Sequence, residues 1–542
     1  MSSSAESAAP LPAPPSEIGV PTTVPWLALG AVFLGTFIST VNTRFSTFGL
    51  ADIRGAIHAG FDDGAWITTA QGAAQVLIAP LAVWLGTVFG PRRVLLEAAI
   101  AFAVISLIEP FSINLPMLLG LHFAGGLASG FFVPLNVAFV LRNMPPRLWA
   151  YGIAIYALNL ELSLNISASL EGWYVDHWSW RWIFWQNVPL ALGMAACLQF
   201  TTHRDTVLAG PHRADWFGFA FAGIGLALIY AALDQGNRLD WQNSPLIWGL
   251  ALSGALLFAA FLVHERNTDA PFLNLAVALG SPMPRLLLLV GFLRFTLLST
   301  AYVIPQFLGV VRGFRALEVG QTLIWIASPQ LFICLLAGYL LRRSDPRIVA
   351  SVGFLLICTA CLMVAYGLTP LWGTDQFLPS ALLQALGQSF ALSGTIFFAV
   401  LHLRPQDALT FGASIQVARI MGGEIGSAFI NTFVRVREQI ASNQLGQHLK
   451  VGDGQLLARI QGYATATASA GDPQSGAIRG AATLARVVQQ LATTQAIIDS
   501  LIVLAAATAI TLILIVTRRA APLGPASHVP FFAVVPRPAR ST

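Results

Sequence analysis

Long apolar stretches, separated by short polar segments, recur along the chain from Trp26 to Val516. Each is about 20 residues long, the length that a helix needs to cross the hydrocarbon layer of a bilayer. A helix satisfies its own backbone hydrogen bonds, which lipid requires. The pattern predicts fourteen transmembrane helices. They are expected at 26–49, 66–89, 94–112, 115–141, 149–173, 182–201, 216–235, 245–264, 286–309, 318–341, 348–369, 377–401, 408–433 and 493–517.

Composition supports an all-helical integral membrane protein. The chain is 56% apolar and 10% charged, whereas soluble domains carry about a quarter charged residues. The net charge of +5 comes from basic residues scattered singly between apolar stretches, so nucleic acid is not an expected partner. The four cysteines lie in predicted spans, and Cys358 and Cys361 are interpreted as small core residues. No metal site and no cofactor are expected.

Arginine placement predicts the orientation of the chain. With the N-terminus inside, the short loops on the cytoplasmic side hold fourteen arginines, whereas the short outer loops hold five. The positive-inside rule therefore places both termini in the cytoplasm. Residues 1–24 and 518–542 are expected to be cytoplasmic tails, and the inner (plasma) membrane is the expected location.

A weak internal repeat suggests two parallel halves. The string GPRRV at 90–94 follows the second span, and DPRIV at 345–349 follows the tenth. Parallel halves with a substrate path between them are a transporter architecture. We expect an N-terminal six-helix half at 25–201, two inserted helices with their linkers at 202–284, and a C-terminal six-helix half at 285–517.

Four strings, in this order and topology, resemble a known family. They are WIFWQNVP at 182–189, ADWFG at 214–218, LDQG at 233–236 followed by DW at 240–241, and RIMGG at 419–423. With them the chain resembles the fourteen-helix drug:proton antiporters of the major facilitator superfamily, the EmrB/QacA type, as a divergent member. The resemblance implies a major facilitator fold, two six-helix halves plus two inserted helices, and proton-coupled drug export.

The loop between the second and third spans departs from the family motif. At 83–92 the chain has Thr87 and Val88 where the family has a charged gate pair. Gly90 and Arg92 match the motif and keep the structural or gating role that the resemblance implies.

Other departures fall on positions that carry coupling in the family. Asn42 stands where the first span usually has an aspartate, and His122 and Gly125 replace an arginine and a glutamine in the fourth span. The antiporter motif of the fifth span, usually glycine-proline with further glycines, is absent from 163–172. The family's residues therefore cannot simply be carried over here.

A different set of ionisable groups lies within the predicted spans. Each ionised group near the bilayer centre costs on the order of 3 kcal/mol, so these groups should face one another or water. The set is Arg44, His122, Glu161, Arg294, Arg419 and Glu424.

Substrate binding is predicted at Arg44, His122 and Arg294. The resemblance puts the first and fourth spans of each half around a central cavity, and these residues lie on three of those four spans. Such a cavity would attract an anion, because the arginine fork suits carboxylate or phosphate. The alternatives are arginines paired with glutamates as structural links, and a satisfied interior histidine.

Proton coupling is predicted at Glu161 and Glu424, because a carboxyl group in apolar surroundings can load and release a proton. The alternative is a structural pair with an arginine. Arg419, which is five residues from Glu424, should find its partners on other helices. Gly422 and Gly423 are interpreted as structural, since small residues let helices approach closely.

The outside segment at 438–492 is expected to form a helix carried outward from the thirteenth span and a returning helix. A breaker string, GDPQSG at 471–476, separates the two. The resemblance implies contact with a periplasmic adaptor protein; a solvated hairpin without a partner is the alternative.

We expect a secondary active transporter that exports a small amphipathic organic compound, anionic if the arginines bind it, in exchange for protons by alternating access. An importer or facilitator of the same fold stays open, as does a non-transporting membrane protein. An enzyme is not expected, because no nucleophile and base cluster at one membrane face. No G-x-x-x-x-G-K-[ST] string is present for ATP binding.

Overall fold

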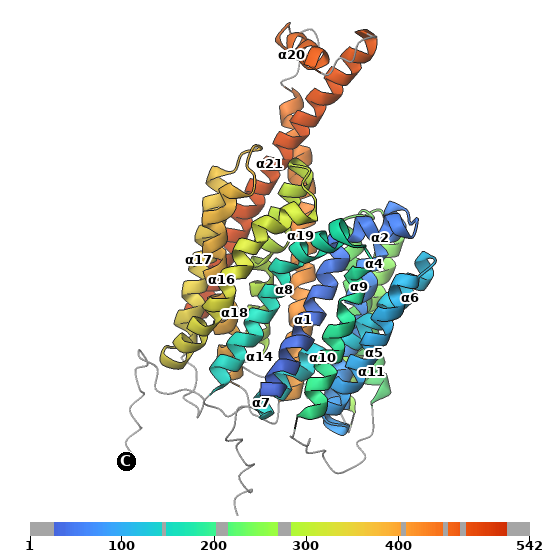
Figure 1. Ribbon diagram of the computed structural model, residues 1–542, viewed down its shortest axis with the longest axis vertical. Coiled ribbons are helices and arrows are strands. Elements are labelled where there is room, and N and C mark those ends of the chain that lie inside the picture. The colour runs from blue at the N-terminus through green and yellow to red at the C-terminus, as the bar shows by residue number, and fades with distance from the viewer. Residues whose placement is uncertain are drawn as a thin grey trace, which may run out of the picture.

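The computed structural model describes residues 26–143, 148–201, 215–268, 283–402, 408–447, 454–466 and 473–517. Every regular element in these residues is a helix, and most helices run along the long axis of the molecule (Figure 1). The predicted tails at 1–24 and 518–542 lie outside the described residues.

The first six spans are formed by long helices with short outer helices between them. They are α1 (Trp26–Phe48), α4 (Trp66–Val88), α5 (Pro91–Ile108), α6 (Leu115–Gly130) continued by α7 (Phe132–Asn143), α8 (Trp149–His177), and α9 (Trp182–Trp185) with α10 (Asn187–Phe200). The short helices α2 (Leu50–Ala56) and α3 (Phe61–Gly64) connect α1 to α4.

Two further helices precede the last six spans. The inserted helices are α11 (Trp216–Gly236) and α12 (Pro245–Asn267). The ninth span is α14 (Met283–Thr296), continued by the π-helical segment η3 (Ser299–Val303), α15 (Ile304–Gln306) and the π-helical segment η4 (Phe307–Val311). The others are α16 (Ala316–Arg343), α17 (Pro346–Gly367), α18 (Leu378–Val400), α19 (Ala408–Gln447) and α21 (Pro473–Val516).

The predicted spans reappear as helices. Thirteen stretches of the described residues are long and apolar enough to cross a membrane, and each overlaps a predicted span. The remaining prediction, 408–433, lies within α19, which carries Arg419 and Glu424.

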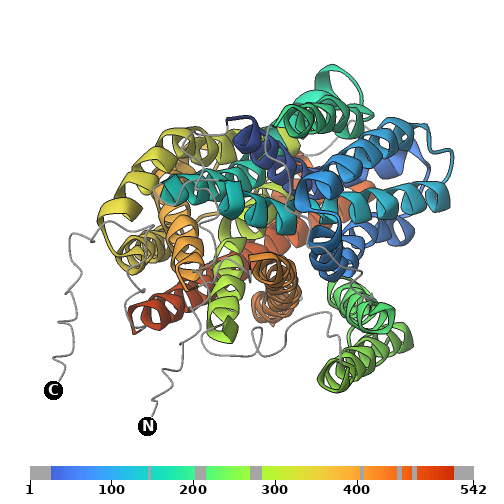
Figure 2. The ribbon, with the colours of Figure 1, turned by 90° about the horizontal axis from the view of Figure 1, so that it is seen from below.

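Two seams join the first six spans to the last six. In one seam α8 packs along α16, and in the other α4 and α7 pack against α19. The inserted helices lie at the edge of the bundle (Figure 2), where α11 contacts α4, α19 and α12. The two seams are therefore formed by helices of the two halves.

Glycines allow α8 and α16 to touch. A Cβ atom built on Gly172 would lie 2.4 Å from the backbone nitrogen of Leu317, and one built on Gly320 would lie 2.5 Å from that of Ser169. Real Cβ atoms do not approach backbone atoms this closely, so any larger residue would force the two helices apart.

The two strings of the weak repeat occupy corresponding places. Each begins the third helix of its half, where proline stands in the first turn and needs no backbone donor. Gly90 precedes Pro91 with a φ of 84°, a conformation that glycine adopts without strain. Asp345 precedes Pro346 and accepts a hydrogen bond from the backbone nitrogen of Arg347 at 2.9 Å.

A helical hairpin extends beyond one end of the bundle. Figure 1 shows α19 and α21 leaving the bundle together, with α20 (Gly454–Ala466) at the tip. The returning helix begins at Pro473, within the predicted breaker string. A Cβ atom on Gly480 would lie 2.3 Å from the carbonyl oxygen of Ile460, so α20 packs closely on α21.

Candidate transport site

Arg44 links the first span to the ninth, and thus one half to the other. Its Nη2 donates a hydrogen bond to the carbonyl of Ala301 at 2.6 Å, and its guanidinium lies 4.9 Å from the ring centre of Phe48. Ala301 belongs to the π-helical segment η3, a kind of segment found often at functional sites. Pro305, four residues further on, has no N–H for this carbonyl. Pro305 cannot donate to this carbonyl, and Arg44 does.

Arg294 and Arg419 lie close to this link. Arg294 projects from α14 toward Gly423 on α19, where an added Cβ atom would lie 3.7 Å from its Nε. Arg419 donates to the side-chain oxygen of Gln416, on its own helix, at 2.9 and 3.2 Å. The expectation that Arg419 finds its partners on other helices is therefore wrong for these two bonds.

The three guanidinium groups form one cluster, called the arginine cluster below: Arg44, Arg294 and Arg419. Arg294 is close enough to the other two arginines to repel both electrostatically. Among the described residues no carboxylate forms an ion pair with any of the three. The described residues therefore do not form the arginine–glutamate pairs of the alternative interpretation.

Unused hydrogen-bonding groups surround the arginine cluster. The Nε atoms of Arg44 and Arg294 are buried and lack an acceptor among the described residues. The hydroxyl of Tyr156, on α8, is close enough to Arg294 and Arg419 to interact with both, and it also lacks a hydrogen-bond partner there. An oxyanion would supply both the missing charge and the missing acceptors.

Glu161 lies at the seam between the halves. It projects from α8, is fully buried, and accepts hydrogen bonds from Ser389 Oγ at 3.2 Å and Gln330 Nε2 at 3.4 Å. These partners belong to α18 and α16, in the other half. Glu161 also interacts electrostatically with Arg294 without bonding to it. The structure thus brings this predicted coupling residue to the edge of the arginine cluster.

Amide and hydroxyl side chains continue the Glu161 site. Asn165 donates to Gln388 Oε1 at 3.0 Å, and Gln388 donates to Thr300 Oγ1 at 2.8 Å. One turn away, Gln384 donates to Ser299 Oγ at 3.2 Å. The chain of bonds connects α8, α18 and η3, so it joins the halves. Sequence reasoning considered ionisable residues and missed this set, although glutamines within apolar spans are a usable signal.

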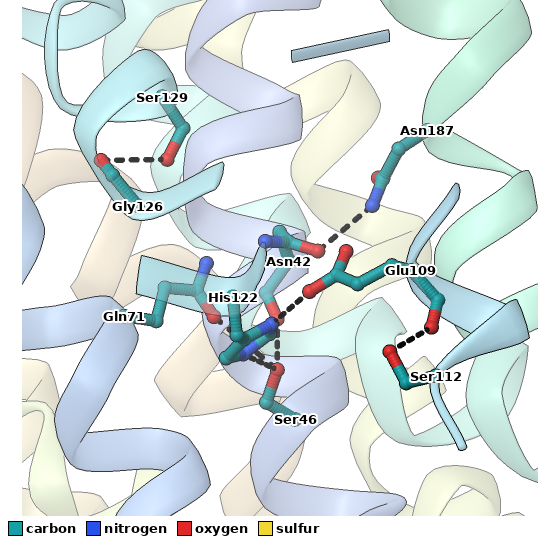
Figure 3. A network of polar contacts seen from close by, with 9 residues as sticks. All are labelled: Asn42, Ser46, Gln71, Glu109, Ser112, His122, Gly126, Ser129 and Asn187. Atoms are coloured by element: carbon teal, nitrogen blue, oxygen red, sulfur yellow. Dashed lines mark hydrogen bonds and ion pairs between the residues drawn. The ribbon is translucent and has the colours of Figure 1, made fainter. Parts of the chain in front are cut away.

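His122 lies elsewhere, inside the N-terminal half. Figure 3 shows its ring between Glu109 and Ser46: Nδ1 contacts the carboxylate, and Nε2 is 2.9 Å from the hydroxyl oxygen. That hydroxyl is also 3.2 Å from the side-chain oxygen of Gln71. His122 is 1% exposed and Glu109 is 2% exposed. The structure therefore gives His122 internal partners and does not bring it to the arginine cluster.

Asn42, at the position of the family's aspartate, forms a neutral link nearby. Its side-chain oxygen accepts a hydrogen bond from Asn187 Nδ2 at 2.8 Å (Figure 3). The bond connects α1 to α10 within one half. The departure from the family pattern thus replaces an ionisable group with an amide pair.

Glu424 faces away from the arginine cluster, toward the inserted helix α11. It is half-buried on α19, and it is close enough to Tyr230 and Asp234 to interact with both. Five residues separate it from Arg419, which turns the two side chains about 140° apart around the helix. Asp234 was missed as a site residue, although it is an acidic residue inside a predicted span, one residue before its end.

Gly90 and Arg92 hold the start of α5 in place. The Nε and Nη2 atoms of Arg92 donate to the carbonyls of Leu198 and Gln199, at 2.8 Å each. These carbonyls belong to the last turn of α10, where the helix has no further backbone N–H groups to bond them. Arg92 therefore ties the third span to the sixth.

Gly422 holds α19 close to α14. A Cβ atom on Gly422 would lie 2.6 Å from the Cα atom of Gly291. Gly426, one turn on, meets the ring of Phe295, at 2.7 Å for an added Cβ. Close packing of these two helices sets the distance between Arg294 and Arg419, which they carry.

Two groups of spans that meet along two seams, with polar side chains buried between them, have the architecture of a membrane transporter. The model of the Major Facilitator Superfamily matches residues 32–428. The chain belongs to this superfamily, and the predicted fold is confirmed.

Relatives within the superfamily include exporters. Over 421 residues the chain is 25% identical to the multidrug export protein EmrB of Escherichia coli (strain K12), covering 77% of this chain and 81% of that protein. It is 22% identical over 439 residues to the fatty acid resistance protein FarB of Neisseria gonorrhoeae, covering 78% and 83%. The chain is thus similar to exporters of the EmrB type.

A solved structure shows the same fold. The crystal structure of the human organic anion transporter MFSD10 aligns with a TM-score of 0.57 at 15% identity, covering 91% of this chain and all of that one.

Proposed function

We propose that the protein is a proton-coupled secondary transporter that exports a small amphipathic organic anion by alternating access between its halves. The names of two relatives support export, since EmrB is a multidrug export protein and FarB a fatty acid resistance protein. A fatty acid ionised at neutral pH is itself an amphipathic anion.

The arginine cluster carries the proposal. Three guanidinium groups with no carboxylate partner among the described residues project from α1, α14 and α19, and the cost of unpaired charge in a membrane makes a bound anion the natural partner. The Nε atoms of Arg44 and Arg294 and the hydroxyl of Tyr156 supply donors for its oxygens. Sequence reasoning also predicted His122 as a substrate contact, and that stays a prediction.

Glu424 is our first candidate for proton coupling, and Glu161 our second. An ionised Glu161 beside Arg294 would compete with an anionic substrate, so its protonation would favour substrate binding, as in cotransport. Exchange requires instead that the proton binds away from the substrate and acts on the substrate site through movement of a helix. Glu424 lies away from the arginine cluster but on the same helix as Arg419, so α19 would transmit its protonation state.

The test is flux through proteoliposomes under a pH gradient. The probe is an alkyl sulfonate, which stays ionised and does not follow the gradient passively. We expect accumulation on the acidic side when that side carries the α19–α21 hairpin. A Glu424→Gln protein should lose this accumulation but keep counterflow exchange, which needs no proton. Transport of a lipophilic cation of equal size in preference to the sulfonate would overturn the proposed substrate class.

We also propose the inner membrane as the location, cytoplasmic termini, and contact of the hairpin with a periplasmic adaptor. The hairpin exposes large apolar side chains, among them Leu457 at 50% and Ile478 at 73%, which a partner could cover. Co-purification of the native hairpin with the adaptor, and its loss on removal of 454–466, would support this contact. A solvated hairpin would show neither.

A further inference from the structure

A string of polar contacts begins at the end of the bundle that carries the hairpin. Asp62, in the short helix α3, is 79% exposed and forms an ion pair with Arg238 at 2.7 Å. Arg238 Nε donates to Gln235 Oε1 at 2.7 Å, and Gln235 Nε2 donates to Thr69 Oγ1 at 2.5 Å. The string thus leads from an exposed carboxylate into the contact between α4 and α11.

Asp234 is the inner end of these contacts. Its carboxylate accepts hydrogen bonds from the Thr69 hydroxyl and, at 3.1 Å, from Gln235 Nε2. The side chain is half-buried, and it lies on the same face of α11 as Tyr230, one turn away. An acidic residue in this place needs its partners because it lies within a membrane span.

Tyr230 bridges the remaining distance to Glu424. Its hydroxyl is close enough to the Glu424 carboxylate to interact with it, and Asp234 is close enough to interact electrostatically with both. The ring of Tyr230 is buried against α4 at Gly72, where an added Cβ atom would lie 2.2 Å from the hydroxyl oxygen. Gly72 therefore makes the room that this tyrosine occupies.

We propose that Asp234 and Tyr230 form the proton path to Glu424, so that the inserted helix α11 supplies the route for the coupling proton. The inference rests on the proposed function, in which Glu424 couples proton binding to export. Asp234, which is half-buried near the end of α11, takes a proton from water, while Arg238 and Gln235 hold the string in place and carry no proton themselves. Tyr230 gives its hydroxyl proton to the Glu424 carboxylate while it takes the proton of Asp234. The net change is a neutral Glu424 and an ionised Asp234, with Tyr230 restored.

The path is separate from the arginine cluster. It follows α4, α11 and α19 along the flank of the bundle, whereas the arginines project from α1, α14 and α19, and Arg44 bonds to η3. A hydrogen bond from Trp241 Nε1 to Thr432 Oγ1, at 2.9 Å, fixes the chain just after α11 to α19. Substrate and proton can therefore occupy the protein without sharing a site, and α19 contacts both places.

Two substitutions in the full-length protein test the path. Asp234→Asn keeps an oxygen for Thr69 but cannot be protonated, and Tyr230→Phe removes only the hydroxyl. Both should slow sulfonate export driven by a pH gradient at least about tenfold, the scale of a lost proton-transfer group, with counterflow unchanged. Asp240→Asn is the matched control, because Asp240 lies just beyond α11, outside the string, and its carboxylate accepts a hydrogen bond from Asn243. This variant should transport like the native protein.

The outcomes separate this inference from the proposed function. If Glu424→Gln keeps gradient-driven export, coupling through Glu424 is wrong and the path fails with it. If Glu424→Gln uncouples transport while both Asp234→Asn and Tyr230→Phe export at the native rate, only the path is overturned. Should Asp234→Asn misfold and lose counterflow, Tyr230→Phe decides: slowed export with intact counterflow supports the path, and native export refutes it.

Discussion

Pro305 illustrates how one uncharged residue sets the place of a charged one. It has no N–H to donate to the carbonyl of Ala301, four residues earlier, and Arg44 of the other half donates to that carbonyl. A guanidinium has five N–H donors, so this bond leaves others for a ligand. Residues with no charge therefore help to determine where the arginine cluster forms.

The first residue-scale prediction concerns Arg294. Replacing it with glutamine removes charge-assisted hydrogen bonds worth roughly 1.5–3 kcal/mol, so we expect the Kd of an alkyl sulfonate to rise by about tenfold or more. Binding of a neutral alcohol of the same chain length should change little. Calorimetric titration of the purified protein measures both. Arg312→Gln is the control, since Arg312 is exposed and lies beside Phe314, away from the arginine cluster. An equal loss for both ligands would show that Arg294 is structural.

The second residue-scale prediction concerns the buried pair of His122 and Glu109. Removing one member strands the other, which costs roughly 3–5 kcal/mol. We expect His122→Leu to lower the thermal midpoint in detergent markedly, and the double variant with Glu109→Leu to recover part of the loss. If the single variant keeps its stability but loses sulfonate binding, His122 contacts substrate as the sequence suggested.

Ionisable residues could be located from sequence, but their partners could not. Each of the six predicted groups stood out as an isolated charge or histidine in an apolar stretch. Arg419 bonds to Gln416 of its own helix, whereas other partners come from other helices: Glu161 meets Ser389 of α18, and Glu424 lies beside Tyr230 of α11. Such contacts depend on helix rotation and packing, which hydrophobic spacing along one span does not determine.

At the scale of elements, the seam between α8 and α16 depends on two glycines. We predict that Gly172→Ala slows gradient-driven export and counterflow together, because the added methyl group meets the backbone of Leu317 and overpacking costs roughly 1–3 kcal/mol. Flux in proteoliposomes measures both rates. Gly120→Ala is the control, since an added Cβ there meets nothing within 4 Å. Loss of gradient-driven export with counterflow intact would mean that this seam acts in proton coupling and not in the closing of the two halves on each other.

Element positions followed well from the sequence, and element shapes less well. Runs of about 20 apolar residues suffice to place a span. They do not show that the fourth span breaks at Phe131 or that the ninth contains η3 and η4. Those features depend on backbone hydrogen bonding, for which Pro305 was the one local signal in the ninth span.

At the scale of the whole molecule, orientation remains a prediction from arginine placement. Tags at Met1 and Thr542 should both be accessible only from the cytoplasm, while a tag at Asp472 should be accessible from outside. Protease protection in intact cells and inverted vesicles measures this. A cytoplasmic tag at Asp472 would contradict the span count. It would also place the entrance of the proposed proton path on the cytoplasmic side of the membrane.

The length of α19 gives the hairpin a mechanical property. The helix has 40 residues, about 60 Å at 1.5 Å per residue, and roughly 35 Å of it lies between Glu424 and its outer end. If α19 tilts as a rigid rod by about 10°, its outer end sweeps about 6 Å, so a sub-ångström shift beside Glu424 becomes a displacement the size of a side chain. The hairpin then acts as a lever arm, and a protein resting on its tip would sense each turnover without touching the membrane.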